Sequence, residues 1–146
     1  MLKTIGDYAF RGCYKLSSID FTNCEFLQEI KSHAFEGCST LSQVILSKNL
    51  SGLSQGVFSN CLFSSFNIQD SIKYLANFCL SGCKSLQAIN IGPESQLVSI
   101  GIGAFSGTLI TQIHLPKMYH MLVNTHLWVL LFLMKLFVTL KTISSQ

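Results

Sequence analysis

The sequence predicts a solenoid of stacked parallel coils, and two observations carry this prediction. Five copies of one apolar pattern follow one another between residues 2 and 116, at a spacing of 22 to 25 residues. Each copy combines an aromatic or leucine anchor with a later pair of apolar residues two positions apart. A repeat of this length cannot bury its own apolar side, so the copies must stack and share a core.

The anchor organises the first half of each copy. The five anchors are Phe10, Phe35, Phe58, Leu80 and Phe105. Each follows a small residue directly, and each has isoleucine or leucine five positions earlier. This spacing is too short for a long helix, so we expect a turn or a short 3₁₀ or α piece that packs the anchor inward. The anchors are then expected to form a stacked spine.

A glycine-rich column lies two residues past the anchor. It contains Gly12, Gly37, Asn60, Gly82 and Gly107. Glycine adopts positive φ freely, and asparagine tolerates it better than other residues do. The column therefore predicts a left-handed residue that closes a turn in every copy.

The second half of each copy has the spacing L-x-x-I-x-L, as in Leu16, Ile19 and Phe21. Its last two apolar positions have the spacing of a strand with one buried face. Because all copies run in the same direction, we expect one short strand per copy and parallel pairing at about 4.7 to 4.9 Å. The predicted fold class is a leucine-rich repeat solenoid, with short parallel strands on one face, turns or short 3₁₀ or α pieces on the other, and a C-terminal apolar helix.

Six cysteines follow the repeat and do not have the pattern of a disulfide framework. Four lie in the column directly after the glycine column, and one lies directly before an anchor. These five are Cys13, Cys38, Cys61, Cys83 and Cys79. We expect them to be small buried residues with free thiols, because parallel in-register Cβ vectors are a poor geometry for a bridge. Cys24 lies in a variable connector and is the candidate for exposure.

The core I-x-x-x-A-F-x-G-C-x-x-L occurs from Ile5 to Leu16 and from Ile30 to Leu41. It resembles the repeats of the BspA-like leucine-rich repeat surface protein family, and the resemblance covers residues 2–116. Members of that family occur on the surfaces of mucosal bacteria and in parasitic protists. The resemblance implies adhesion to host matrix proteins, to cells or to other microbes, and it implies no catalysis.

Residues between the core positions of the strands are expected to face the concave side, where solenoids usually bind. The predicted ligand-binding residues are Ser18, Asp20, Thr22, Gln43, Ile45, Ser47, Ser65, Asn67, Gln69, Ala88, Asn90, Gln112 and His114. This face is polar and nearly uncharged, and Ile45 is its one large apolar residue. Such a face suits hydrogen bonding to an extended protein or a glycan, and it equally suits a solvated sheet without a ligand.

No pattern predicts catalysis, a cofactor or a metal site. The serines lie outside any G-x-S-x-G setting. His33 and His114 fall at outward repeat positions, where they have no zinc-ligand spacing to cysteines or carboxylates. The net charge is only +3 and the basic residues are scattered, so no nucleic-acid footprint is present. The sequence predicts a protein that is not an enzyme.

One modification motif stands apart from the repeat. Asn49-Leu50-Ser51 matches the acceptor pattern for N-glycosylation. Leu50 belongs to a core column, so modification requires that Asn49 alone be exposed. Triplets of this kind also arise by chance, and both interpretations stay open at this stage.

The repeat pattern stops at residue 117, where an apolar tail begins. Residues 118–140 are rich in Leu, Met, Val and Phe, but the longest run without a polar residue is Leu127 to Met134. This run is short for a membrane span, and Lys135 follows it directly. The tail is expected to be a membrane anchor, a helix that caps the last coil, or a segment released from the repeat constraint.

The family resemblance and the possible anchor imply a protein-interaction module for adhesion or partner recognition at the cell surface. Its expected partners are a protein or glycan ligand, such as host matrix or a cell surface, with membrane contact through residues 118–140. Residues 1–20 contain no apolar run of signal-peptide length, and the abrupt start is typical of a fragment or a shortened copy. The alternative is a cytoplasmic scaffold or a degenerate repeat fragment without a dedicated ligand.

Overall fold

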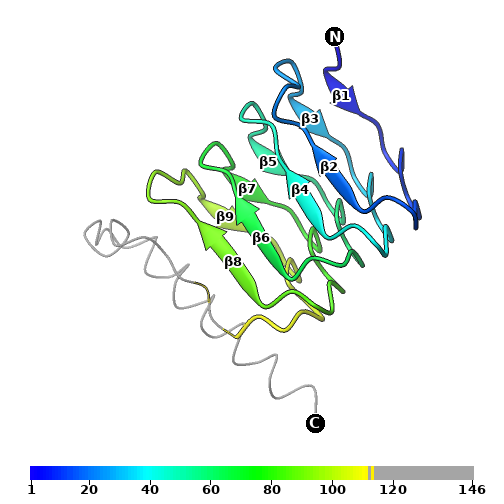
Figure 1. The fold of residues 1–146 in the computed structure, drawn as a ribbon. Coiled ribbons are helices and arrows are strands. Elements are labelled where there is room, and N and C mark those ends of the chain that lie inside the picture. The colour runs from blue at the N-terminus through cyan, green and yellow to red at the C-terminus, as the bar shows by residue number, and fades with distance from the viewer. Residues whose placement is uncertain (112, 114–146) are drawn as a thin grey trace.

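The computed structural model describes residues 1–111 and residue 113, which form a parallel β-solenoid (Figure 1). These residues form nine short strands and no helix. The strands are β1 (Thr4–Ile5), β2 (Ser18–Asp20), β3 (Glu29–Ile30), β4 (Gln43–Ile45), β5 (Gly52–Leu53), β6 (Ser65–Ile68), β7 (Tyr74–Leu75), β8 (Ala88–Ile91) and β9 (Ser99–Ile100). Each coil stacks on the preceding one, and the shared core lies between the two columns of strands.

Each of the first four coils carries strands at two positions, whereas we predicted one strand per copy. The longer strands, β2, β4, β6 and β8, follow the L-x-x-I-x-L pattern. The two-residue strands, β1, β3, β5, β7 and β9, end on the isoleucine or leucine five positions before each anchor. All the pairings are parallel and in register, as in Ile19 opposite Val44 and Leu53 opposite Leu75. The prediction was wrong because in-register stacking also pairs the short extended segments before the anchors, as in β1 with β3 and β5 with β7.

The anchor segment forms turns, which confirms one of the alternatives that we expected. Within the first coil, the N–H of Arg11 donates to the carbonyl of Tyr8 at 3.0 Å. Between coils, the N–H of Phe10 donates to the carbonyl of Ala34 at 2.7 Å, and the residues two positions before and after each of the first four anchors donate in the same way. Turn hydrogen bonds and coil-to-coil hydrogen bonds therefore alternate along this segment.

The predicted left-handed column is confirmed. Its members Gly12, Gly37, Asn60, Gly82 and Gly107 have φ angles between 58° and 72°. At each of these residues the chain leaves the turn and continues toward a longer strand. Glycine adopts this conformation without the steric cost that other residues meet, which explains why glycine occupies four of the five positions.

A second left-handed column, two residues before the anchor, was not predicted. Its members Tyr8, His33, Gly56, Phe78 and Gly103 have φ angles between 57° and 64°. Three of the five are bulky, and positive φ is uncommon for such residues, so the sequence carried no signal for it. Positive φ at two positions four residues apart also explains why the segment does not continue as a helix.

The rings of this second column pack toward the next coil. Tyr8 and His33 stack with ring centroids 5.2 Å apart and an interplanar angle of 6°. A Cβ atom at Gly56 would lie 2.4 Å from His33, and one at Gly103 would lie 2.4 Å from Phe78. In these two pairs the ring of one coil fills the space beside the glycine of the next coil, which has no side chain.

The anchors form the expected spine. Phe10 and Phe35 stack at 5.1 Å and 1°, and Phe35 and Phe58 stack at 5.5 Å and 13°. Phe58 then meets Phe63 edge-on at 86°. Phe35 and Phe58 are fully buried, whereas Phe10 in the first coil is 43% exposed. Burial of the spine therefore depends on a coil on each side.

The expected C-terminal apolar helix at residues 118–140 lies outside the described residues. Among the residues that the structure describes, no helix has the length and apolar character needed to cross a bilayer.

A pair of glycine variants tests the cost of the left-handed column. Gly37→Ala should lower the free energy of unfolding by about 1–2 kcal/mol, because Gly37 has φ +71° and its added Cβ atom would touch only Gly12 at ordinary distance. Gly6→Ala is the control, since it has no positive φ and no neighbour within 4 Å of the added atom. Urea unfolding measures both, and equal midpoints for the two variants would contradict the assignment.

Candidate binding face

The outward positions along β2, β4, β6 and β8 form one exposed face, which we call the candidate binding face (Figure 1). Nine of the predicted ligand-binding residues are exposed: Ser18, Asp20, Thr22, Gln43, Ile45, Ser65, Asn67, Ala88 and Asn90. Gln69 is half-buried and Ser47 is buried, while Gln112 and His114 lie outside the described residues. The strict alternation of exposed and buried residues along β6 is that of a strand with one buried face.

Parallel pairing aligns the outward side chains in rows along the solenoid. Asp20 lies opposite Ile45, and Asn67 lies opposite Asn90. The repeat alignment puts Ile45 and Asn67 at the same position of successive coils. These four residues form one row, which we call the central row. Backbone pairing holds Asp20 beside Ile45 and Asn67 beside Asn90 at the spacing of parallel strands, about 4.8 Å, whereas β4 and β6 belong to separate sheets.

Two asparagines of the central row are joined by a hydrogen bond. The Nδ2 atom of Asn90 donates to the Oδ1 atom of Asn67 at 2.7 Å. This bond uses one donor and one acceptor, and each amide has further capacity for both. Ile45, beside them in the row, is 48% exposed. The central row therefore combines oriented amides with one apolar contact point.

Asp20 is the one charged residue among the described members of this face. Hydrogen bonds from the hydroxyl and the backbone N–H of Thr22 lower the pKa of Asp20, and the backbone bond is 2.8 Å long. The carboxylate therefore stays ionised at neutral pH. Its charge lies at one end of the central row, and the rest of the described row is neutral.

Ser47 was predicted to lie on the face, and the structure corrects this. Ser47 is 1% exposed, and its hydroxyl donates to the carbonyl of Cys24 at 3.1 Å. The same hydroxyl accepts the N–H of Asn49 at 3.3 Å. Leu46 is also buried, so strand alternation ends at Ile45 and the chain turns inward there. Ser47 holds the connector together and is not available to a ligand.

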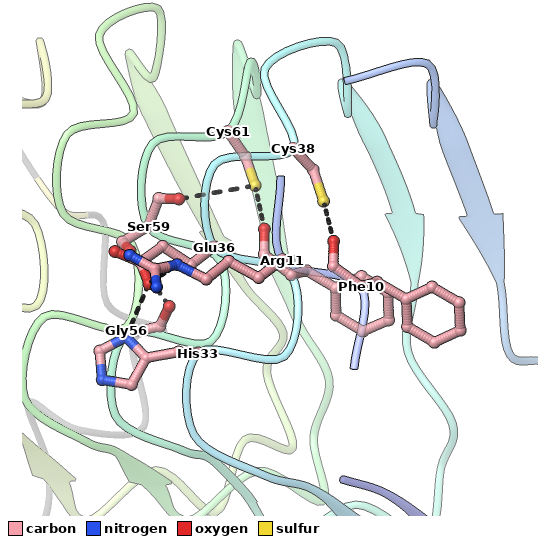
Figure 2. A network of polar contacts seen from close by, with 9 residues as sticks. Phe10, Arg11, His33, Glu36, Cys38, Gly56, Ser59 and Cys61 are labelled. Atoms are coloured by element: carbon pink, nitrogen blue, oxygen red, sulfur yellow. Dashed lines mark hydrogen bonds and ion pairs between the residues drawn. The ribbon is translucent and has the colours of Figure 1, made fainter. Parts of the chain in front are cut away.

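A network of polar side chains lies on the turns and away from this face (Figure 2). The Nε atom of Arg11 pairs with the Oε2 atom of Glu36 at 2.9 Å, and the Nδ1 atom of His33 lies 3.3 Å from the same oxygen. The Arg11 guanidinium also lies over the ring of Tyr8 at 5.5 Å. We expected His33 to be a surface residue, but it is half-buried because its left-handed backbone directs the ring along the stack.

The cysteine column bonds to the anchor column of the preceding coil. Figure 2 shows the Sγ atoms of Cys38 and Cys61 directed at backbone carbonyls. Cys38 donates to Phe10 at 3.1 Å, Cys61 to Phe35 at 3.3 Å, and Cys83 to Phe58 at 3.2 Å. These bonds satisfy carbonyls in the core and explain why a small donor occupies the column.

All six cysteines are free, as expected. Burial raises the pKa of Cys83 to about 11 and that of Cys79 to about 12, so these thiols stay protonated. Cys24 is half-buried, and so is Cys13, which we expected to be buried; Cys13 belongs to the first coil. Residues 1–111 and 113 contain no group of three histidines, cysteines or carboxylates that could hold a metal ion.

Comparison with known proteins places these features in a family. The family model for the BspA type leucine-rich repeat region matches residues 3–125 with six copies. The chain belongs to this BspA-type family. The model counts one copy more than the five anchors, and its match extends past residue 116. No curated relative matches the chain significantly.

One solved structure resembles the solenoid. It is the crystal structure of a leucine-rich repeat protein from Bacteroides ovatus ATCC 8483, with a TM-score of 0.55 and 23% sequence identity. The match covers 80% of this chain and 36% of that protein, so the chain spans about a third of its length. At this identity the similarity shows the leucine-rich repeat fold alone. Proteins of this family and fold are generally non-enzymatic, and their repeats generally mediate protein binding.

The burial of the thiols predicts their reactivity. In the native chain at pH 8, Cys13 and Cys24 should react quickly with an aromatic disulfide reagent. The other four should react only on unfolding, because they are buried and because a pKa near 11 leaves roughly one Cys83 thiol in a thousand ionised. Absorbance of the released thiol measures both phases.

Two variants assign these phases. Cys13→Ser should remove one equivalent from the fast phase. Cys79→Ala should remove one equivalent from the slow phase alone, because other copies carry alanine at this position. Fewer than six equivalents in denaturant without a reducing agent would show that some cysteines are bridged.

Proposed function

We propose that this chain is a non-catalytic interaction module that binds a protein or glycan through its candidate binding face. The observation that carries the proposal is the central row, in which Ile45, Asn67 and Asn90 are exposed on a rigid stack of strands. A ligand with regularly spaced polar groups can hydrogen-bond to such amides. Because backbone pairing fixes Asp20 beside Ile45 and Asn67 beside Asn90, the protein loses little conformational entropy on binding.

The candidate binding face carries little charge, which favours recognition by hydrogen bonding and by shape. Asp20 is the one charge among the described face residues, so long-range attraction contributes little. Ile45 supplies an apolar surface of the kind that contacts a side chain or the carbon face of a sugar ring. Ser65 and Gln43 flank the row with further polar groups. This combination suits an extended polypeptide or a glycan.

We place this binding at the cell surface as part of the same proposal. Members of the BspA-type family are often surface-associated, which supports a role in adhesion to host matrix or to another cell. Residues 118–140 supply the proposed contact with a membrane, or else a cap on the last coil. Predicted partners are a protein or glycan ligand, without nucleic acid.

A cytoplasmic scaffold is the second candidate, and the cysteines favour it. All six thiols are free, and four of them are buried in repeat positions that need no oxidising compartment. Such a scaffold would use the same face for an intracellular partner, and a degenerate array would use none. The two candidates therefore differ in location and in ligand.

Charged substitutions in the central row test the binding face. Asn67→Arg and Ile45→Arg should each weaken binding of the purified chain to decellularised epithelial matrix at least tenfold, because an unpaired guanidinium must lose water on binding. Tenfold corresponds to about 1.4 kcal/mol. Gln55→Arg is the matched control, since Gln55 is exposed in the anchor segment, outside the face. Surface plasmon resonance measures the affinities, and equal loss in all three variants would contradict the proposal.

Removal of the tail tests the proposed location. The full chain should sediment with membranes and be labelled by surface biotinylation, whereas the chain lacking residues 118–146 should be released to the soluble fraction. Immunoblotting of the fractions measures the distribution. Recovery of the full chain in the cytosol alone would exclude the surface role and favour the scaffold.

A further inference from the structure

The sequon Asn49-Leu50-Ser51 lies in the connector from β4 to β5. Figure 1 shows this connector as a loop beyond the arrowhead of β4. Asn49 and Ser51 are exposed, whereas Leu50 between them is fully buried in the core. The middle residue therefore fixes the loop, and the acceptor and the hydroxyl residue face water on either side of it. From the sequence, modification required that Asn49 be exposed beside the core residue Leu50. The structure has this arrangement.

We propose that Asn49 is an N-glycosylation site. In the transfer, the Nδ2 atom of Asn49 forms a bond to the anomeric carbon of a lipid-pyrophosphate-linked oligosaccharide. The bond from that carbon to the pyrophosphate oxygen breaks, Nδ2 gives up one proton, and the lipid pyrophosphate leaves. The oligosaccharide donor is supplied by the membrane of the secretory compartment. The proposal rests on the surface location in the proposed function and is independent of whether the candidate binding face has a ligand.

The contacts of Asn49 are compatible with a glycan. Its Nδ2 atom donates to the backbone carbonyl of Glu25 in the preceding coil. The side-chain amide has two protons, and the glycosylated form keeps one of them, so it can keep this hydrogen bond. The bond orients the amide on the preceding coil while the side chain as a whole stays exposed. The sugar then extends into solvent and displaces no core contact.

The surroundings of the sequon support the same conclusion. The backbone N–H of Asn49 is bound to the buried hydroxyl of Ser47 at 3.3 Å, so the loop has a defined form. The strand alternation has already ended at Ile45, and the chain has turned inward before Asn49 is reached. A glycan at Asn49 is therefore attached beyond the end of β4 and not to the central row.

Translation of the full chain with microsomes tests the proposal. The chain is fused to a cleavable signal sequence, and only molecules protected from added protease are scored, because these have entered the lumen. We expect one step of lower mobility that peptide N-glycosidase removes. Asn49→Gln and Ser51→Ala should both abolish the step. Asn23→Gln is the matched control and should keep it, because Asn23 is exposed but Glu25 follows it where a sequon needs serine or threonine.

Two outcomes would overturn the proposal: protected wild-type chain without a glycan, and a glycan that persists in Asn49→Gln. The transfer occurs on the entering chain before folding is complete, so its loss in Ser51→Ala is not a consequence of misfolding. Urea unfolding of the glycosylated and enzymatically deglycosylated forms then tests the structural argument. Equal midpoints are expected, and a lower midpoint for the glycosylated form would show that the fold does not accommodate the sugar at Asn49.

Discussion

The structure depends on in-register hydrogen bonding between successive coils. The strands pair residue for residue, and the turns do the same through the anchor segment, where Phe10 donates to Ala34 and Phe35 to Val57. Within the paired strands and along the turns, a residue in one coil therefore meets its counterpart in the next. Because of this constraint, the residues at one repeat position form a column, and all residues of a column lie in the same kind of environment. Columns that face the core must hold residues that stack on themselves, as the phenylalanine anchors do at 5.1 and 5.5 Å.

The same constraint couples the identity of a residue to its neighbour in the next coil. The ring of His33 occupies the space beside Gly56, and that of Phe78 the space beside Gly103, so a side chain added at either glycine would meet the ring, whereas Tyr8 stacks on the ring of His33. The cysteine column also links successive coils, because the thiols of Cys38, Cys61 and Cys83 each donate to the anchor carbonyl of the preceding coil. Stability is then a sum over neighbouring interfaces, and a substitution in one coil acts through the coil beside it.

The repeat pattern predicted those features that depend on one column at a time. The phenylalanine spine, the left-handed glycines such as Gly12 and the free thiols all follow from what a single column tolerates. The short strands at Ile5 and its equivalents were not predicted, because a two-residue strand exists only through pairing with the next coil. His33 and Ser47 were misplaced for related reasons. His33 is half-buried because its backbone is left-handed, and Ser47 is buried because it hydrogen-bonds to Cys24 in the connector of the preceding coil. The neighbouring sequence indicates neither feature.

For function, the in-register stack leaves the outward positions as the part of the sequence that is free to vary. The core columns repeat similar apolar residues from coil to coil, whereas the central row changes from Asp20 to Ile45 and then to Asn67 and Asn90. Because the backbone holds these side chains at fixed spacing, the order of charge, apolar side chain and amides is itself a pattern that a ligand can match. Recognition by such a surface depends on which residue each coil contributes, and the fold contributes the spacing between them.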